Sequence, residues 1–149
     1  MSIWGRMSLH GGVWRVHASA VDDLELISDS LKWLSDDIEG VNTERIKSAL
    51  GAPMYCIECR MNSKKARESL GKIGQDSLNS LLSSGIGLKI DEDKVLHIRL
   101  DLGSLVRGKP VLARESGVSV VKGRFKLEVY PGQDASTIAE GLIKEASRT

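Results

Sequence analysis

The sequence predicts an α+β fold, a largely antiparallel mixed sheet with helices packed on one face. Segments that alternate apolar and polar residues recur along the 149 residues, and most are joined by short turns that favour hairpins. Between them lie segments whose apolar residues recur at helical spacing. With 41% hydrophobic residues, the chain is long enough for one packed core. We therefore expect a flexible tail over 1–10 and a single α+β domain over 11–149.

The first elements are a strand and a helix. Residues 13–20 alternate in polarity, which is typical of a half-buried strand. Asp22 and Asp23 should begin the helix, because acidic groups are favourable at a helix N-terminus. The helical spacing of apolar residues continues toward Gly40, where we expect the segment to end.

A hairpin and two helices are predicted next. Residues 44–50 and 54–61 flank Gly51-Ala-Pro53, which is typical of a short turn between two strands. Ser63 should cap a helix over 64–73 and Asp76 a second helix over 77–82, which Gly85 and Gly87 end.

The last third should contribute a second hairpin and a closing helix. Residues 86–90 and 95–100 surround the polar segment Asp91-Glu-Asp93, which predicts two strands and a turn. The remaining elements are, in order, a helical turn over 102–106, a basic loop over 109–118, a strand over 120–130 and a helix capped by Asp134.

Charge is segregated along the chain. Residues 1–59 hold five Lys or Arg against nine Asp or Glu, and residues 60–149 hold sixteen against eleven, although the formal net charge is only +1. Folding does not require such segregation, but a surface that meets a polyanion does.

The predicted strands place cations on one face of the sheet. His97 and Arg99 alternate with apolar residues in one strand, and Lys122, Arg124 and Lys126 do so in another. If the helices cover the apolar face, the other face is polar and rich in cations. Such a face could hold phosphates, and a merely solvated face is the alternative.

Basic residues also gather in the helix predicted over 64–73. Lys65 and Arg67 lie in its first turns, where cations are unfavourable because the helix dipole is already positive. A phosphate held there by free N–H groups would explain them, and a solvated surface helix is the alternative.

No catalytic or metal-binding pattern competes with this interpretation. Cys56 and Cys59 form a single C-x-x-C within a predicted strand, where side chains three residues apart point to opposite faces. The three histidines lie far apart in sequence, with no carboxylate evidently placed to orient them. We therefore predict no enzymatic activity, no cofactor and no metal.

The chain should be cytoplasmic. It holds no apolar run of about 18 residues, which excludes a membrane-spanning helix. Its start lacks the apolar core of a signal peptide.

Several short segments carry a resemblance to a known family. They are Val16-His-Ala-Ser-Ala20 before an acidic helix, Leu50-Gly-Ala-Pro53, Lys65-Ala-Arg67, Leu96-His-Ile-Arg-Leu-Asp101 and Phe125-Lys-Leu-Glu-Val-Tyr-Pro131. Over most of residues 12–147 the chain resembles small archaeal proteins predicted to bind RNA or to be exosome subunits. That family is similar to the ribosomal protein that binds 5S ribosomal RNA, so the resemblance implies a ribosomal-protein-like fold. The chain departs from the pattern over 109–122, where its connection is longer.

Together these observations predict a non-enzymatic RNA-binding protein that contacts the phosphate backbone, as an accessory of exosome or ribosome-associated complexes. Aromatic residues make up only 4% of the chain, which favours structured or double-stranded RNA over stacked single strands. The residues predicted to bind RNA are Arg15, Arg60, Lys65, Arg67, Arg99, Lys122, Arg124 and Lys126.

The alternative is a protein-interaction or homodimerisation module that uses the same sheet face. A nuclease acting through Asp91, Asp93 or Asp101 is a distant third hypothesis.

Overall fold

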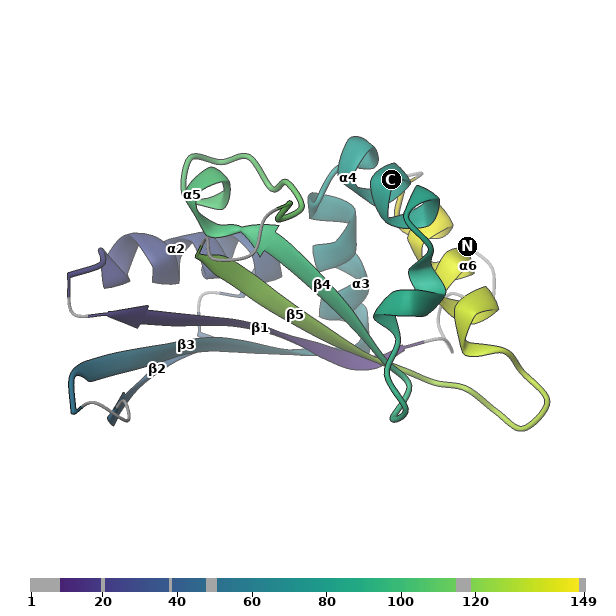
Figure 1. Cartoon of the computed structure of the whole chain (residues 1–149), viewed down its shortest axis with the longest axis horizontal. Coiled ribbons are helices and arrows are strands. Elements are labelled where there is room, and N and C mark those ends of the chain that lie inside the picture. Colours follow the sequence, from purple (N-terminus) through teal and green to yellow (C-terminus); the bar gives the residue numbers. More distant parts are fainter. Residues whose placement is uncertain (1–8, 20, 38, 48–50, 115–118, 148–149) are drawn as a thin grey trace.

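The computed structural model describes residues 9–19, 21–37, 39–47, 51–114 and 119–147. The elements in chain order are β1 (Leu9–Ser19), α2 (Leu24–Ser35), β2 (Val41–Lys47), β3 (Pro53–Asn62), α3 (Ser63–Lys72), α4 (Gln75–Ser83), the 3-10 helix η1 (Ile86–Lys89), β4 (Val95–Asp101), α5 (Leu102–Leu105), β5 (Val120–Leu127) and α6 (Ala135–Ala146) (Figure 1). None of the helices in these ranges is long and apolar enough to cross a membrane.

One five-stranded sheet organises the molecule, with the strand order β2-β3-β1-β5-β4. Every neighbouring pair is antiparallel, which confirms the predicted α+β class. In Figure 1 the strands cross the lower part of the molecule and the helices lie above them. The sheet therefore has one face covered by helices and one open face.

The centre of the covered face is built from two aromatic rings and two glycines. Trp14 and Phe125 are fully buried and meet edge to face, with ring centroids 5.2 Å apart. Trp14 lies opposite Gly123, and Phe125 lies opposite Gly12. A Cβ atom on Gly123 would come within 2.5 Å of the Trp14 ring, and one on Gly12 within 2.7 Å of the Phe125 ring. The glycines thus leave the space that the aromatic rings occupy.

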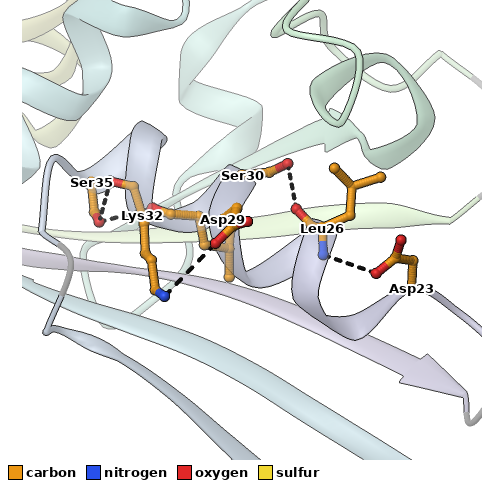
Figure 2. Close-up of polar contacts among 7 residues, drawn as sticks. Asp23, Leu26, Asp29, Ser30, Lys32 and Ser35 are labelled. Atoms are coloured by element: carbon orange, nitrogen blue, oxygen red, sulfur yellow. Dashed lines mark hydrogen bonds and ion pairs between the residues drawn. The ribbon is translucent and has the colours of Figure 1, made fainter.

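Helix α3 is fixed to this face by a polar contact as well as by apolar packing, and α2 has a side-chain cap at its N-terminus. The Trp14 indole N–H donates to the Ser69 hydroxyl across 2.6 Å in the core, which ties α3 to β1. Figure 2 shows the contacts of α2, where the Asp23 side chain caps the N-terminus by accepting from the Leu26 N–H at 3.1 Å. Asp23 therefore begins this helix as predicted.

Several predicted boundaries and caps need correction. The strand β2 begins at Val41, before the predicted residue 44. Asn62 caps α3 instead of Ser63, and α4 begins at Gln75 after Gly74, so Asp76 lies inside that helix. The helix α2 ends at Ser35, before Gly40, because Asp36 adopts a left-handed conformation with φ of 54° and its N–H bonds back to Lys32 and Trp33. The strand β1 begins at Leu9, inside the predicted tail, and Leu9 pairs with Leu127. Residues 1–8 of that tail lie outside the described part of the chain.

The hairpin predicted over 86–90 and 95–100 is wrong in its first strand. Residues Ile86–Lys89 form η1, with N–H groups of Leu88 and Ile90 bonding to carbonyls three residues earlier. The reason is Gly85, whose φ of 84° turns the chain into this helix. Of residues 86–90, only Ile90 bridges to β4, which pairs along its length with β5 instead.

The other elements of the second half follow the prediction more closely. The helical turn α5 lies within the predicted 102–106, and Asp134 caps α6 by accepting from the Thr137 N–H. Strand β5 stops at Leu127, short of the predicted Tyr130. Within the predicted basic loop, Leu112 bridges to Leu100 of β4, and residues 115–118 lie outside the described ranges.

Candidate nucleic-acid interface

Strand register brings cations from four strands onto the open face. Arg15 of β1 lies opposite Glu58 of β3 on one side and Lys122 of β5 on the other. Lys122 in turn lies opposite Arg99 of β4. Because directly opposed residues of antiparallel strands point to the same face, these side chains form one row across the sheet.

Two further rows run parallel to the first. Arg60 lies opposite Val13, which lies opposite Arg124, which lies opposite His97. Lys126 belongs to the third row. We call the resulting surface the basic face and define it by Arg15, Arg60, His97, Arg99, Lys122, Arg124 and Lys126.

The basic face is compact. Lys122 and Lys126 are four residues apart on one strand, which corresponds to about 14 Å. The three strand spacings from β3 to β4 also add up to about 14 Å. A surface of this size can contact several phosphates of one RNA at once.

One carboxylate lies among these cations. Glu58 accepts from the Arg15 Nη2 at 2.6 Å through one oxygen and from the Arg60 Nε at 2.6 Å through the other. Burial raises the pKa of Glu58, but the hydrogen bonds from Arg60 and Arg15 outweigh it and hold that pKa below its usual value. Glu58 therefore stays ionised at neutral pH, and it orders two cations while neutralising part of their charge.

The strongest positive charge lies on β4 and β5. Arg99, Lys122 and Arg124 are exposed and make no ion pair with any described residue. Lys126 is exposed as well, and its ammonium donates to the carbonyl of Asp93. At the other end of the face, β2 contributes Asn42 and Glu44 instead of cations. The basic face is thus centred on β5.

The structure does not bring Lys65 and Arg67 to this face. Both belong to α3, which packs on the covered face, where Ala66 lies 3.4 Å from the position of a Cβ on Gly12. The Lys65 ammonium donates to the Asp36 carbonyl at 2.7 Å, beyond the C-terminus of α2. This contact gives the basic N-terminus of α3 a structural explanation, because a cation is favourable at the negative end of the neighbouring helix.

His97 has an orienting carboxylate, contrary to the sequence-based expectation. Its Nε2 lies 2.7 Å from the Asp91 Oδ2, across the turn that joins η1 to β4. That hydrogen bond is the main reason why the pKa of Asp91 is lowered, with the N–H groups of Val95 and Asp93 adding to it. Asp91 and His97 are only six residues apart in the sequence, but this contact can be predicted only when the chain is known to turn back at Asp91.

The other candidate catalytic groups have structural roles. Asp101 accepts from the Ser104 N–H and hydroxyl, at 3.1 and 2.6 Å, and so caps α5. Cys56 lies on the open face and Cys59 is buried on the covered face, which confirms their predicted opposite orientation. Burial raises the pKa of both thiols, so neither is an activated thiolate. Among the described residues no group of three His, Cys, Asp or Glu could hold a metal ion.

One helix of the covered side, α2, carries the opposite charge at its N-terminus. Asp22 and the cap residue Asp23 precede it, Glu25 lies in its first turn, and Asp29 follows one turn later, paired at 3.8 Å with Lys32 (Figure 2). A polyanion would therefore be repelled by this helix and attracted by the basic face.

The fold is shared with archaeal proteins of known structure. Protein AF2318 from Archaeglobus fulgidus, described as DUF54, is 22% identical, with a TM-score of 0.76 over 90% of this chain and 99% of that one. Mth689, a DUF54 protein from Methanothermobacter thermautotrophicus, is 18% identical, with a TM-score of 0.72 over 93% of this chain and 98% of that one. A UPF0201 protein from Methanococcus jannaschii is 10% identical, with a TM-score of 0.57 over 92% and 98% of the two chains.

The family of the chain is shown by comparing its sequence with models of protein families. No curated protein matches the chain. A family model described as RNA binding matches residues 13–127, which run from β1 to the end of β5 and include every residue of the basic face. The chain therefore belongs to the RNA-binding family.

Proposed function

We propose that this protein binds structured RNA through its basic face and does so without catalysis. The observation that carries the proposal is the convergence of cations from β1, β3, β4 and β5 on one open face of a chain that belongs to the RNA-binding family. Phosphate contacts of this kind supply affinity without reading sequence.

Within the proposed interface the residues contribute unequally. Arg99, Lys122 and Arg124 form the centre, because they make no ion pair with other described residues. Arg15 and Arg60 contribute through a charge that Glu58 partly neutralises. Lys65 and Arg67 remain outlying charges, and replacing either should weaken binding less than replacing Arg124.

The shape of the basic face favours structured RNA. Val13 and Gly11 are the β1 residues that lie between the cation-bearing positions. The aromatic residues of the cation-bearing strands alternate with the basic positions and so lie on the covered face; they are Trp14, Tyr55 and Phe125. Bases splayed onto a sheet need such aromatic platforms, whereas a double helix presents phosphates and 2′-hydroxyl groups to a polar surface. The host complex that we propose is an exosome or ribosome-associated complex in the cytoplasm, in keeping with the family resemblance.

Homodimerisation through the same face is the weaker hypothesis. In a symmetric dimer the same patch meets itself, so Lys122 and Arg124 would face the same cations of the second copy. Like charges brought together in this way are repulsive. A light-scattering mass that corresponds to a dimer at every concentration, together with loss of RNA binding, would favour it.

The proposal is tested by filter binding of an RNA hairpin at several salt concentrations. Six Lys or Arg side chains on the basic face predict that log K falls against log salt with a slope of about −4 to −5. Arg124→Ala should reduce the magnitude of that slope by about 1. The matched control is Lys144→Ala, which removes an exposed cation of α6 on the helical side. A slope near zero, or equal effects of both substitutions, would contradict the proposal.

A further inference from the structure

A groove lies beside β4, at the edge of the sheet that borders the basic face. Its volume is about 670 Å³, within the range of small-ligand sites. Four segments form its walls, and they are α4, η1, β4 and residues 111–114. Because β4 is the last strand of the sheet, the groove opens where the basic face ends.

Cations surround the groove. Lys89, Arg99 and Arg114 line it together with His97, whereas Asp76 is the acidic lining residue. His97 and Arg99 also belong to the basic face, so the groove and that face share two side chains. An anionic ligand in the groove would therefore be continuous with a polyanion on the basic face.

Exposed apolar side chains and hydroxyl groups both line the groove. Leu88 is 90% exposed and Val111 is 43% exposed, although both are large apolar side chains. Ser77 and Ser80 of α4 and its C-cap residue Ser84 recur at helical spacing on the side of this helix that lines the groove. The Ser77 and Ser84 hydroxyls donate to backbone carbonyls, and Ser80 makes no hydrogen bond with the described side chains.

We propose that this groove holds one unpaired nucleotide of the RNA whose double-stranded part lies on the basic face. A nucleotide joins a flat apolar base to a hydroxylated sugar and an anionic phosphate, which are the three chemistries of the groove. Imidazole and guanidinium groups such as those of His97 and Arg99 stack on bases, and serine hydroxyls both donate to and accept from base edges and the 2′-hydroxyl. The proposal rests on the RNA-binding function proposed above and names the RNA as one with a bulge or an unpaired end.

The test compares a blunt RNA hairpin with the same hairpin carrying a single-nucleotide bulge, by fluorescence anisotropy. The wild type should bind the bulged hairpin about tenfold more tightly, because the groove holds one base in addition to the phosphate contacts of the basic face. Ser80→Glu and Leu88→Asp each add a carboxylate to the lining of the groove, which repels the phosphate of a bound nucleotide. Both variants should bind the two hairpins equally. Asn79→Glu is the matched control, because Asn79 is the exposed neighbour that does not line the groove, and it should keep the tenfold preference.

The outcomes separate this proposal from the one on which it rests. Equal binding of both hairpins by the wild type, or a preference that persists in Ser80→Glu or Leu88→Asp, overturns the nucleotide groove and leaves RNA binding by the basic face intact. The absence of salt-dependent binding of either hairpin to the wild type overturns both proposals.

Discussion

Replacing Glu58 by Gln should lower the stability of the protein and raise its affinity for RNA. Glu58 is only 18% exposed and bonds two guanidinium groups, through one carboxylate oxygen each. Losing two charge-assisted contacts at the edge of solvent should cost about 1 to 2 kcal/mol in the free energy of unfolding. For a chain of this size that corresponds to a fall of about 4 °C in Tm.

The expected change in affinity has the opposite sign. Glu58 stands among the cations that we propose to hold phosphates, so its charge repels the ligand and occupies Arg15 and Arg60. A carboxylate about 6 Å from a phosphate in water costs about 0.7 kcal/mol, which corresponds to about threefold in Kd. Glu58→Gln should therefore bind an RNA hairpin about threefold more tightly at low salt.

The contribution of Glu58 to stability should also depend on pH. Its pKa in the folded protein lies below the ordinary value of 4.5, so the folded state holds the proton less tightly than the unfolded state. Stability from this group is then fully present above pH 4.5 and is lost as the pH falls through the lower, folded-state pKa. The free energies of unfolding in urea of the wild type and Glu58→Gln should differ by the same amount at every pH between 5 and 7. This difference should become smaller below pH 4.5.

A matched substitution isolates the role of Glu58. Glu140→Gln removes an exposed carboxylate of α6 on the helical side, and neither Tm nor RNA affinity should change. Weaker RNA binding by Glu58→Gln would refute the reasoning. It would mean that Glu58 favours binding by ordering the two arginines more than it opposes binding by repelling the phosphates. An unchanged Tm would refute the stability argument.

Two further substitutions and one labelling experiment test the packing, one helix cap and the reactivity of a thiol. Gly123→Ala should lower the free energy of unfolding, measured in urea, by about 1 to 3 kcal/mol, because the added Cβ would lie 2.5 Å from the Trp14 ring. Gly141→Ala on α6 is the control, because a Cβ at that position would have nothing within 4 Å. Asp134→Ala should cost about 1 kcal/mol through loss of the cap of α6, and an unchanged midpoint of unfolding would count against that cap. Alkylation by iodoacetamide should be slow at Cys56, because its pKa is raised, and fast labelling at neutral pH would contradict the inert assignment.

Most of the sheet could be predicted from the sequence because its physical signal is local. Alternation along 13–20 and 120–130 gave both the strands and the faces of their side chains, and strand register then placed Arg15 beside Lys122. The opposite orientation of Cys56 and Cys59 followed from the same two-residue period. Local periodicity therefore predicted six of the seven residues of the basic face as candidate ligands, and His97 was recognised only as a neighbour on that face.

The parts that were missed depend on contacts between distant segments. The basic N-terminus of α3 suggested a phosphate site, but Lys65 instead meets the end of α2, which is 29 residues earlier in the chain. The apparent strand at 86–90 is a 3-10 helix because Gly85 turns the chain. The groove beside β4 is assembled from four separate segments, so no local sequence pattern predicts it. The fold likeness to the ribosomal protein that binds 5S RNA stays a prediction.

The central claim is that RNA lies on the open face of the sheet, and lysine footprinting tests it most directly. The protein is acetylated briefly with and without an RNA hairpin, and the modified lysines are quantified by mass spectrometry. We predict that RNA protects Lys122 and Lys126 of β5 and leaves Lys64 of α3 and Lys144 of α6 as reactive as before, since all four side chains are exposed in the absence of RNA. Protection of Lys64 and Lys144 with Lys122 and Lys126 unchanged would contradict the account.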